Sequence, residues 1–153
     1  MPNLETRWIR WIIEKDFPEV LELAKQNPDV IWTEQDLLDR LKQKQKNCVA
    51  MLCERGDIIE AFIVYELHPD RFHILNLVVR EDLRHQGIGR EMIAKLIGKL
   101  HPEHRNRITL TIPEDNLTGQ VFFRSLGFRA IQTIKATNAN ERDTYVMRYK
   151  TNP

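Results

Sequence analysis

The clearest indication of the fold lies in NLVVREDLRHQGIGR, residues 76–90. Its apolar beginning is typical of a β-strand. Apolar residues at spacings of three and four follow the stretch and predict a long amphipathic helix. Those helix positions are Met92, Ile93, Leu96, Ile97 and Leu100. Two of the six glycines, Gly87 and Gly89, separate the strand from the helix. The sequence therefore predicts a strand, a glycine turn and a helix start in direct succession.

Such a junction favours phosphate binding. The first turn of a helix has backbone N–H groups with no partner inside the helix, and the helix dipole adds positive charge there. Glycine also lets a pyrophosphate approach the backbone more closely than a Cβ permits. A dinucleotide fingerprint would need a third glycine and a Walker loop would need Gly-Lys-Ser/Thr, and neither is present. The alternative is a helix entry whose glycines only reverse the chain.

Outside this stretch, strand and helix patterns alternate. Strands are expected at residues 5–13, 48–54, 58–67, 72–80, 107–112, 128–136 and 143–150. One helix is expected to begin with Asp16 as its N-cap and to stop before 27–28. A second follows a capping box of Thr33 and Asp36 and ends near 45, and a short one begins near Asn116. The expected fold class is α/β (α+β mixed): one mixed sheet of about seven strands flanked by about four helices, in a single domain spanning 1–153.

The composition excludes several classes of protein. The 153 residues are 42% hydrophobic, with 23 Lys and Arg against 22 Asp and Glu, which is typical of a globular domain. A net charge of +1 with interleaved signs predicts no general affinity for nucleic acid. No window approaches the ~18 apolar residues of a membrane span, and the N-terminus resembles no signal peptide. We therefore expect a cytoplasmic protein with no nucleic-acid or membrane partner.

The two cysteines are expected to be free thiols. Cys48 and Cys53 lie in one predicted strand. At about 3.3 Å per residue their Cα atoms would be ~16 Å apart, beyond the ~7 Å limit for a disulfide. No CxxC or HxxxH pair accompanies them, so no metal site is expected.

Two segments carry a resemblance to a known family. Arg84, Gly87 and Gly89 match the signature Arg/Gln-x-x-Gly-x-Gly/Ala, and NLVV at 76–79 looks like the strand that precedes it. Asn116 and FFRSLGF at 122–128 look like a second signature, Asn-(x6)-Tyr-x-x-x-Gly-Phe. The sequence resembles the GNAT superfamily of acyl-CoA N-acyltransferases over essentially the whole chain. Its nearest general likeness is to the ribosomal-protein N-terminal alanine acetyltransferases.

The resemblance implies a splayed sheet that binds acetyl-CoA as co-substrate. The strand backbone would pair with the pantetheine arm, the glycine turn would cradle the pyrophosphate, Asn116 would bind near the thioester, and Phe123 would line the channel close to the sulfur. For Asn116, a helix N-cap is the structural alternative. The cofactor residues implied in this way are Leu77, Val78, Val79, Arg84, His85, Gln86, Gly87, Ile88, Gly89, Arg90, Asn116 and Phe123.

The sequence departs from the alanine acetyltransferases at their catalytic positions. Thr111 stands where that branch carries a glutamate, and Phe123 where it carries the signature tyrosine. His73 is our candidate for the general base, because its ordinary pKa of ~6.5 suits proton transfer near neutrality. An exposed structural histidine is the alternative. The backbone N–H of Val78 or Val79 is the candidate oxyanion donor.

Tyr145 and Glu114 are weaker catalytic candidates, since a strand tyrosine and a loop carboxylate have ample structural roles. The tyrosine pair that embraces a peptide N-terminus in that branch is replaced here by Ile134 and Lys135. The sequence therefore leaves the acceptor open.

The resemblance implies an acetyltransferase that moves an acetyl group from acetyl-CoA to a primary amine by direct attack in a ternary complex. The acceptor could be a protein N-terminus, a lysine or a small amine, bound by the first two helices and residues 68–71 and 135–143. The alternative is a CoA-binding regulatory or interaction module with little or no catalysis. Trp8, Trp11 and Trp32 could mark a dimer or partner surface, although tryptophans usually lie in the core. The protein is expected to be a monomer or a homodimer.

Overall fold

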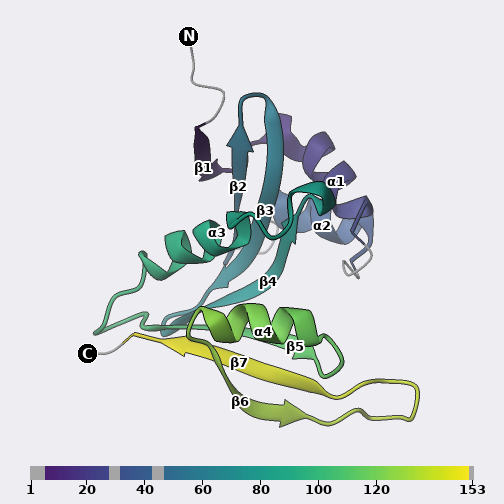
Figure 1. Ribbon diagram of the computed structural model, residues 1–153, viewed down its shortest axis with the longest axis vertical. Coiled ribbons are helices and arrows are strands. Elements are labelled where there is room, and N and C mark those ends of the chain that lie inside the picture. Colours follow the sequence, from purple (N-terminus) through teal and green to yellow (C-terminus); the bar gives the residue numbers. More distant parts are fainter. Residues whose placement is uncertain (1–5, 28–31, 43–46, 152–153) are drawn as a thin grey trace. The chain divides into compact units, whose positions relative to one another are not determined.

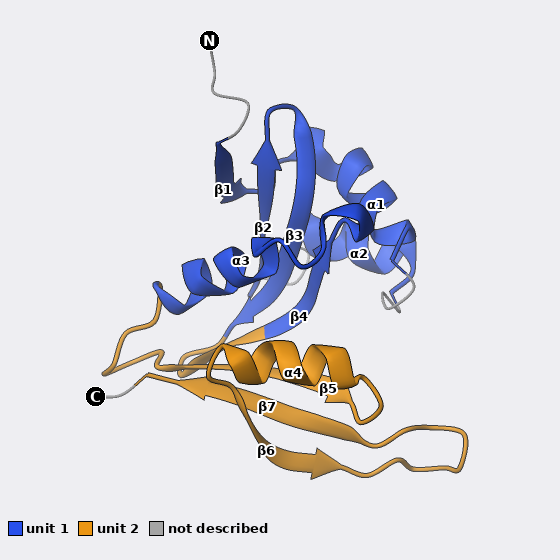
Figure 2. Ribbon diagram, viewed as in Figure 1, with its two compact units in different colours: residues 1–67, 74–98 blue, residues 68–73, 99–153 orange. Residues whose placement is uncertain are grey.

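The computed structural model (Figure 1) describes residues 6–27, 32–42 and 47–151. The chain divides into two compact units, Met1–Leu67 with Ile74–Gly98 and His68–His73 with Lys99–Pro153 (Figure 2). Over the described residues, seven strands are hydrogen-bonded in the order β1-β2-β3-β4-β5-β7-β6. The predicted mixed sheet is therefore confirmed, and the boundary between the units falls inside strand β4 (Arg71–Val79).

The first unit is built on antiparallel strands. β1 (Arg7–Trp11) pairs with β2 (Cys48–Arg55), and β2 pairs with β3 (Ile58–Leu67). Gly56 turns the chain between β2 and β3 with a φ of 61°, as a tight hairpin requires. Helices α1 (Phe17–Lys25) and α2 (Glu34–Leu41) precede β2, and α3 (Ile88–Ile97) follows β4.

Helices cover both faces of this first unit. Figure 1 shows α3 on one side of β2 and β3, and α1 and α2 on the other. Apolar residues of α1 and α2 pack with alternate residues of β2 and β3, because successive strand residues point to opposite faces. The central members of this cluster are Val20, Leu23, Leu37, Leu41, Leu52, Phe62 and Val64. Met92, Ile93 and Leu96 of α3 are fully buried, as the helical spacing predicts.

Some details of the sequence prediction for this unit are wrong. Asp16 precedes α1, but its side chain caps no helix N–H, because it accepts hydrogen bonds from Arg10 and from the Ile13 N–H instead. A one-turn 3₁₀ helix, Glu14–Asp16, stands before α1. Gly89 lies inside α3, and Leu100 lies beyond its end.

One predicted detail of this unit is confirmed, one lies outside the described residues, and the tryptophans differ from their usual burial. The capping box of α2 is confirmed, with the Asp36 N–H 3.1 Å from Thr33 Oγ1. That helix ends at Leu41, and its predicted end near 45 lies outside the described residues. Trp8 and Trp11 are 64% and 50% exposed, against the usual burial of tryptophan.

The second unit contains β5 (Arg107–Pro113), α4 (Leu117–Ser125), β6 (Arg129–Ile134) and β7 (Thr144–Lys150), together with residues 71–73 of β4. β5 pairs in parallel with the start of β4 and antiparallel with β7, and β7 pairs with β6. Buried side chains line one face of these strands and the inner side of α4. They are Ile108, Leu110, Ile112, Phe123, Phe128 and Met147. Phe122 and Leu126 are only half-buried.

Both cysteines are buried free thiols, as predicted. Among the described residues, no helix is long and apolar enough to cross a membrane. A single functional domain over 1–153 stays a prediction.

Candidate functional site

The turn before α3 has an unusual backbone. His85 has a φ of 65° and Gly87 a φ of 86°, so two left-handed residues flank Gln86. Gly87 is the N-cap of α3 and has no side chain to satisfy the first N–H groups of the helix. Alternation of left-handed and ordinary residues at a helix start turns successive N–H groups toward one concavity, which suits an anion. This local geometry agrees with the phosphate-binding interpretation of the sequence.

The space above this turn is open. A Cβ built on Gly87 would meet no atom within 4 Å, so it is the positive φ and not crowding that requires glycine there. Residues 84–87 are exposed, whereas the next side chain, Ile88, is only 1% exposed and anchors the turn. The backbone of residues 84–87 is thus accessible to a ligand, while the buried side chain of Ile88 holds the turn in place.

Charge around the turn is mixed, with cations closest to the helix start. Arg84 and Arg90 flank the two left-handed residues and are exposed. The acidic Asp82 on the preceding 3₁₀ helix, Glu81–Leu83, is 3.5 Å from Arg80 and is thereby partly neutralised. A pyrophosphate at residues 85–90 would therefore have guanidinium groups on both sides. The residues present fit the pyrophosphate of acetyl-CoA.

The end of β4 is held firmly within the first unit. The Arg80 N–H donates to the Glu60 carbonyl of β3 over 2.9 Å. Val78 is 1% exposed, while Leu77 and Val79 are half-buried. The 3₁₀ helix then starts at once, with the Leu83 N–H 3.0 Å from the Arg80 carbonyl. The strand end and the glycine turn are thus joined by a short ordered segment.

His73 lies in the second unit and has a defined partner. Its Nδ1 is 2.7 Å from Thr109 Oγ1, because the parallel register places His73 opposite Thr109. Thr109 is only 7% exposed, so the ring is fixed from its buried side. His73 is half-buried, and the alternative of an exposed histidine is therefore wrong. Sequence reasoning missed Thr109, since the register of strands 36 residues apart leaves no local signal.

Asn116 is the N-cap of α4. Its Oδ1 accepts the Gly119 N–H over 3.0 Å, so the structural alternative for this residue is confirmed. Gly119 packs tightly, with a Cβ at its position only 2.6 Å from Ile112 Cδ1. A role for Asn116 at the pantetheine arm stays a prediction.

Phe123 and Tyr145 occupy different environments. Phe123 is 9% exposed and lies edge-on to Phe128, with ring centroids 5.2 Å apart. Tyr145 is half-buried on β7, opposite Ile112 of β5. Phe123 is therefore part of the aromatic packing between α4 and the strands. Its role in lining a channel close to the sulfur stays a prediction.

The predicted site residues fall into two groups. The first unit carries residues 77–79 and the turn at 84–90. The second unit carries His73, Asn116, Phe123 and Tyr145. Residues 77–79 lie in a strand and 84–87 in the turn before α3, as predicted, whereas Gly89 lies inside the helix and not before it.

Comparison with known proteins supports one family. The family model described as "Acetyltransferase (GNAT) family" matches residues 10–128. No curated protein sequence matches the chain.

Solved structures with this fold cover nearly the whole chain. The ribosomal-protein-S18-alanine N-acetyltransferase from Escherichia coli has a TM-score of 0.82 at 18% identity, covering 95% of this chain and 94% of that one. Ard1 from Thermoplasma volcanium has a TM-score of 0.81 at 19% identity, covering 96% and 99%. NAA60 of Arabidopsis thaliana, in complex with a bisubstrate analogue, has a TM-score of 0.76 at 16% identity, covering 95% and 98%. At these identities the likeness establishes the fold, and the family match extends over most of the sequence. The chain belongs to the GNAT family of acetyltransferases.

Proposed function

We propose that this protein transfers an acetyl group from acetyl-CoA to a primary amine, by direct attack of the amine in a ternary complex. The observation that carries the proposal is the exposed turn with left-handed His85 and Gly87 at the start of α3. Acetyl-CoA supplies a thioester whose acyl carbon is electrophilic. Membership of an acetyltransferase family supports the reaction class.

The chain's own groups would hold the co-substrate at two places. The backbone N–H groups of residues 85–90 would bind the pyrophosphate, with Arg84 beside them. The backbone of residues 77–79 would hydrogen-bond the pantetheine arm as an added strand. The N–H of Val79 would donate to the developing oxyanion. Asn116 and Phe123 would bind near the sulfur, and Tyr145 is kept as a weaker catalytic candidate.

His73 is the proposed general base. A lysine-like amine has a pKa of ~10.4 and is almost entirely protonated at pH 7, so the reaction needs a proton acceptor. With a hydrogen on Nδ1 donated to Thr109 Oγ1, Nε2 would keep the lone pair that accepts the proton. The threonine would thus fix both the ring and its tautomer.

Thermal unfolding with and without acetyl-CoA tests the cofactor site. At about 100 times the dissociation constant a ligand stabilises its protein by about 2.7 kcal/mol, which raises the midpoint by roughly 5–11 °C for a chain of this size. Gly87→Glu should abolish the rise. Gly56→Glu is the matched control, because Gly56 also has a left-handed φ but lies in the β2–β3 hairpin. Equal rises in both variants, or none in the parent protein, would exclude the site.

The base is tested by the pH dependence of acetyl transfer. His73→Gln should lower the rate most near neutrality and remove the part of the pH–rate profile that reports the deprotonation of the base. Thr109→Val keeps the side-chain volume but removes the hydroxyl, so it should change the pH at which the rate falls. Thr109→Ser keeps the hydroxyl and should restore the profile of the parent protein. An unchanged profile in His73→Gln would eliminate His73 as the base.

A CoA-binding module without turnover is the second candidate function. Thr111 is exposed on β5 and Phe123 is buried, and neither side chain can act as an acid or a base. This alternative predicts binding of acetyl-CoA with no CoA release for any amine. Transfer that is lost in Gly87→Glu would exclude it.

We also propose that 1–153 acts as one acetyltransferase domain that is cytoplasmic, needs no metal, and is a monomer or a homodimer. Size-exclusion chromatography with light scattering would separate these two states. Activity retained after treatment with a chelator would support the metal-free mechanism.

A further inference from the structure

One face of the second unit carries aligned basic side chains. Residues directly opposite in a sheet point to the same side, as do residues two apart in one strand. The register aligns Arg71 with Arg107 and Arg107 with Lys150, and it aligns His73 with Thr109 and Thr109 with Arg148. Arg71, His73, Arg107, Arg148 and Lys150 therefore share one face of β4, β5 and β7. We refer to these five residues as the basic face.

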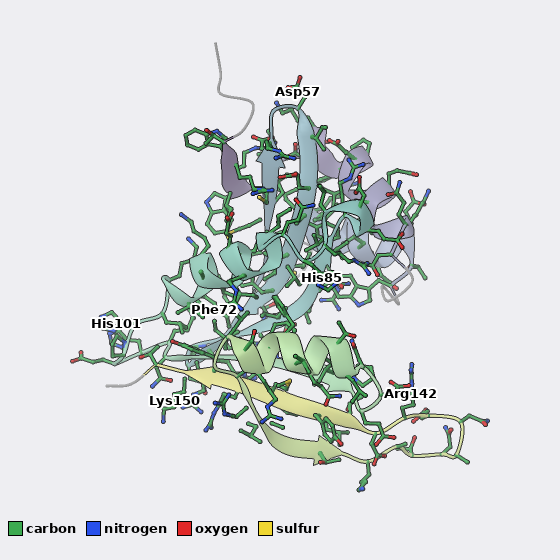
Figure 3. All side chains as sticks on the ribbon, in the orientation of Figure 1. Asp57, Phe72, His85, His101, Arg142 and Lys150 are labelled. Carbon is green, nitrogen blue, oxygen red and sulfur yellow. The ribbon has the colours of Figure 1, made fainter. Side chains whose placement is uncertain are left out.

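The opposite face of these strands is the packed one. Ile108, Leu110 and Ile112 lie at the β5 positions that point away from Arg107, and they are at most 4% exposed. The side chains on the basic face keep more solvent contact, and that of Arg71 is 37% exposed. Figure 3 shows nitrogen-tipped side chains gathered around Lys150 at this end of β7. The basic face is thus the side of the strands that α4 leaves uncovered within the second unit.

The charge of this unit is unbalanced. Residues 68–73 and 99–153 contain ten Lys and Arg against six Asp and Glu, an excess of four, whereas the whole chain carries +1. Two acidic groups of this unit pair with cations of the β6–β7 connection: Asp143 with Lys135 at 3.2 Å, and Asp115, which precedes α4, with Arg142 at 2.7 Å.

On the basic face itself, Arg71 pairs with its neighbour Asp70. Arg148 and Lys150 have no acidic partner among the residues that the structure describes in this unit. The face therefore presents positive charge that the fold does not neutralise.

We infer that the basic face binds the acidic side chains of the acceptor, a polypeptide segment rich in Asp and Glu next to the amine that is acetylated. The inference rests on the proposed function, because it uses His73 as the base. Neighbouring strands are about 4.8 Å apart and residues two apart along a strand about 6.7 Å, so the Cα atoms of the four cationic residues lie about 7 to 12 Å from that of His73.

A single carboxylate would cover only one of these positions. An extended segment with several carboxylates could contact both aligned sets at once, Arg71 with Arg107 and Lys150, and His73 with Arg148, with its amine at His73. Charge complementarity of this kind selects the partner and speeds its encounter.

The test compares two synthetic peptides, each with a free amine. One has four acidic residues next to the amine, and the other has Asn and Gln in their place. Binding is measured by fluorescence anisotropy and transfer by CoA release. The double variant Arg148→Gln/Lys150→Gln removes two cations from the basic face. Lys42→Gln/Lys95→Gln removes the same charge from exposed positions on the first unit and is the matched control.

We expect the acidic peptide to bind and react better than its amide counterpart, with the advantage falling as salt rises. The basic-face variant should lose about 2- to 30-fold of this advantage, the range for two exposed ion pairs, and the control variant should lose none. Transfer at equal rates to both peptides would overturn the inference and leave the proposed function standing.

The other outcomes separate the two proposals further. Preferential binding of the acidic peptide, lost in the basic-face variant but without transfer, would support the binding face and remove catalysis from the proposed function. Binding of a short RNA but of neither peptide would overturn the inference, because phosphates and not carboxylates would then be the partner.

Discussion

Replacement of Asp16 by asparagine should destabilise the protein in a pH-dependent way. Asp16 is 5% exposed, and its carboxylate accepts hydrogen bonds from Arg10 Nη1 at 2.8 Å, Arg10 Nη2 at 2.9 Å and the Ile13 N–H at 2.9 Å. Asp16→Asn keeps the shape but removes the charge and turns an NH₂ group toward the guanidinium. Arg10 keeps a second partner, Glu54, at 2.9 Å.

The size of the effect follows from these contacts. A hydrogen bond to a charged group contributes about 1.5–3 kcal/mol, and complete loss of a partner from a buried pair costs about 3–5 kcal/mol. The side chain of Arg10 is 31% exposed and stays paired with Glu54. Solvent screening therefore places the loss in unfolding free energy at the lower end of these ranges. We expect a loss of about 2 kcal/mol, which lowers the unfolding midpoint by roughly 4–8 °C.

The pH dependence has a definite sign. Hydrogen bonds from Arg10 lower the pKa of Asp16 below its ordinary value, although burial acts in the opposite direction. A carboxyl whose pKa is lower in the folded state stabilises the protein above its unfolded pKa of ~3.9, and this stability is lost as pH falls through the folded pKa. The difference between the parent protein and Asp16→Asn should therefore be complete at pH 7 and shrink below about pH 4.

Urea unfolding at pH 7, 5 and 3 measures this difference. Asp36→Asn removes the same charge from an exposed position in the capping box of α2, and it should cost no more than about 0.5 kcal/mol. Equal losses in the two variants, or a difference that is the same at pH 3 and pH 7, would refute the role assigned to the Arg10–Asp16 pair.

Further predictions concern glycines and thiols. Gly119→Ala should destabilise the protein by about 1–3 kcal/mol in urea unfolding, because the new Cβ would lie 2.6 Å from Ile112 Cδ1. Gly98→Ala, where the closest contacts are ordinary ones of 3.5 Å, should be neutral or stabilise by up to about 1 kcal/mol. Burial raises the pKa of the Cys53 thiol to about 11 and also raises that of Cys48, so at pH 8 iodoacetamide should modify both only as fast as the protein unfolds. Rapid modification of the folded protein would contradict the burial of these residues.

Local features of the sequence were enough to predict the order of the strands and α-helices and the turn before α3. The 3, 4 spacing of Met92, Ile93 and Leu96 identified a helix whose buried side is the one observed. The turn before α3 was predictable because a positive φ favours glycine, as at Gly87. Asp16 was predicted at the correct position with the wrong role, since nothing local indicates that Arg10 on a strand competes for its carboxylate.

The order of strands and helices, the glycine turn and the family could be read from the amino-acid sequence, because these depend on neighbours along the chain. The tertiary structure decided which distant side chains share a face. The partnership of His73 with Thr109 and the alignment of Arg107 with Lys150 both come from strand register. A shift of one residue would turn every one of these side chains to the opposite face, and register is set by the packing of the whole sheet and not by any local segment.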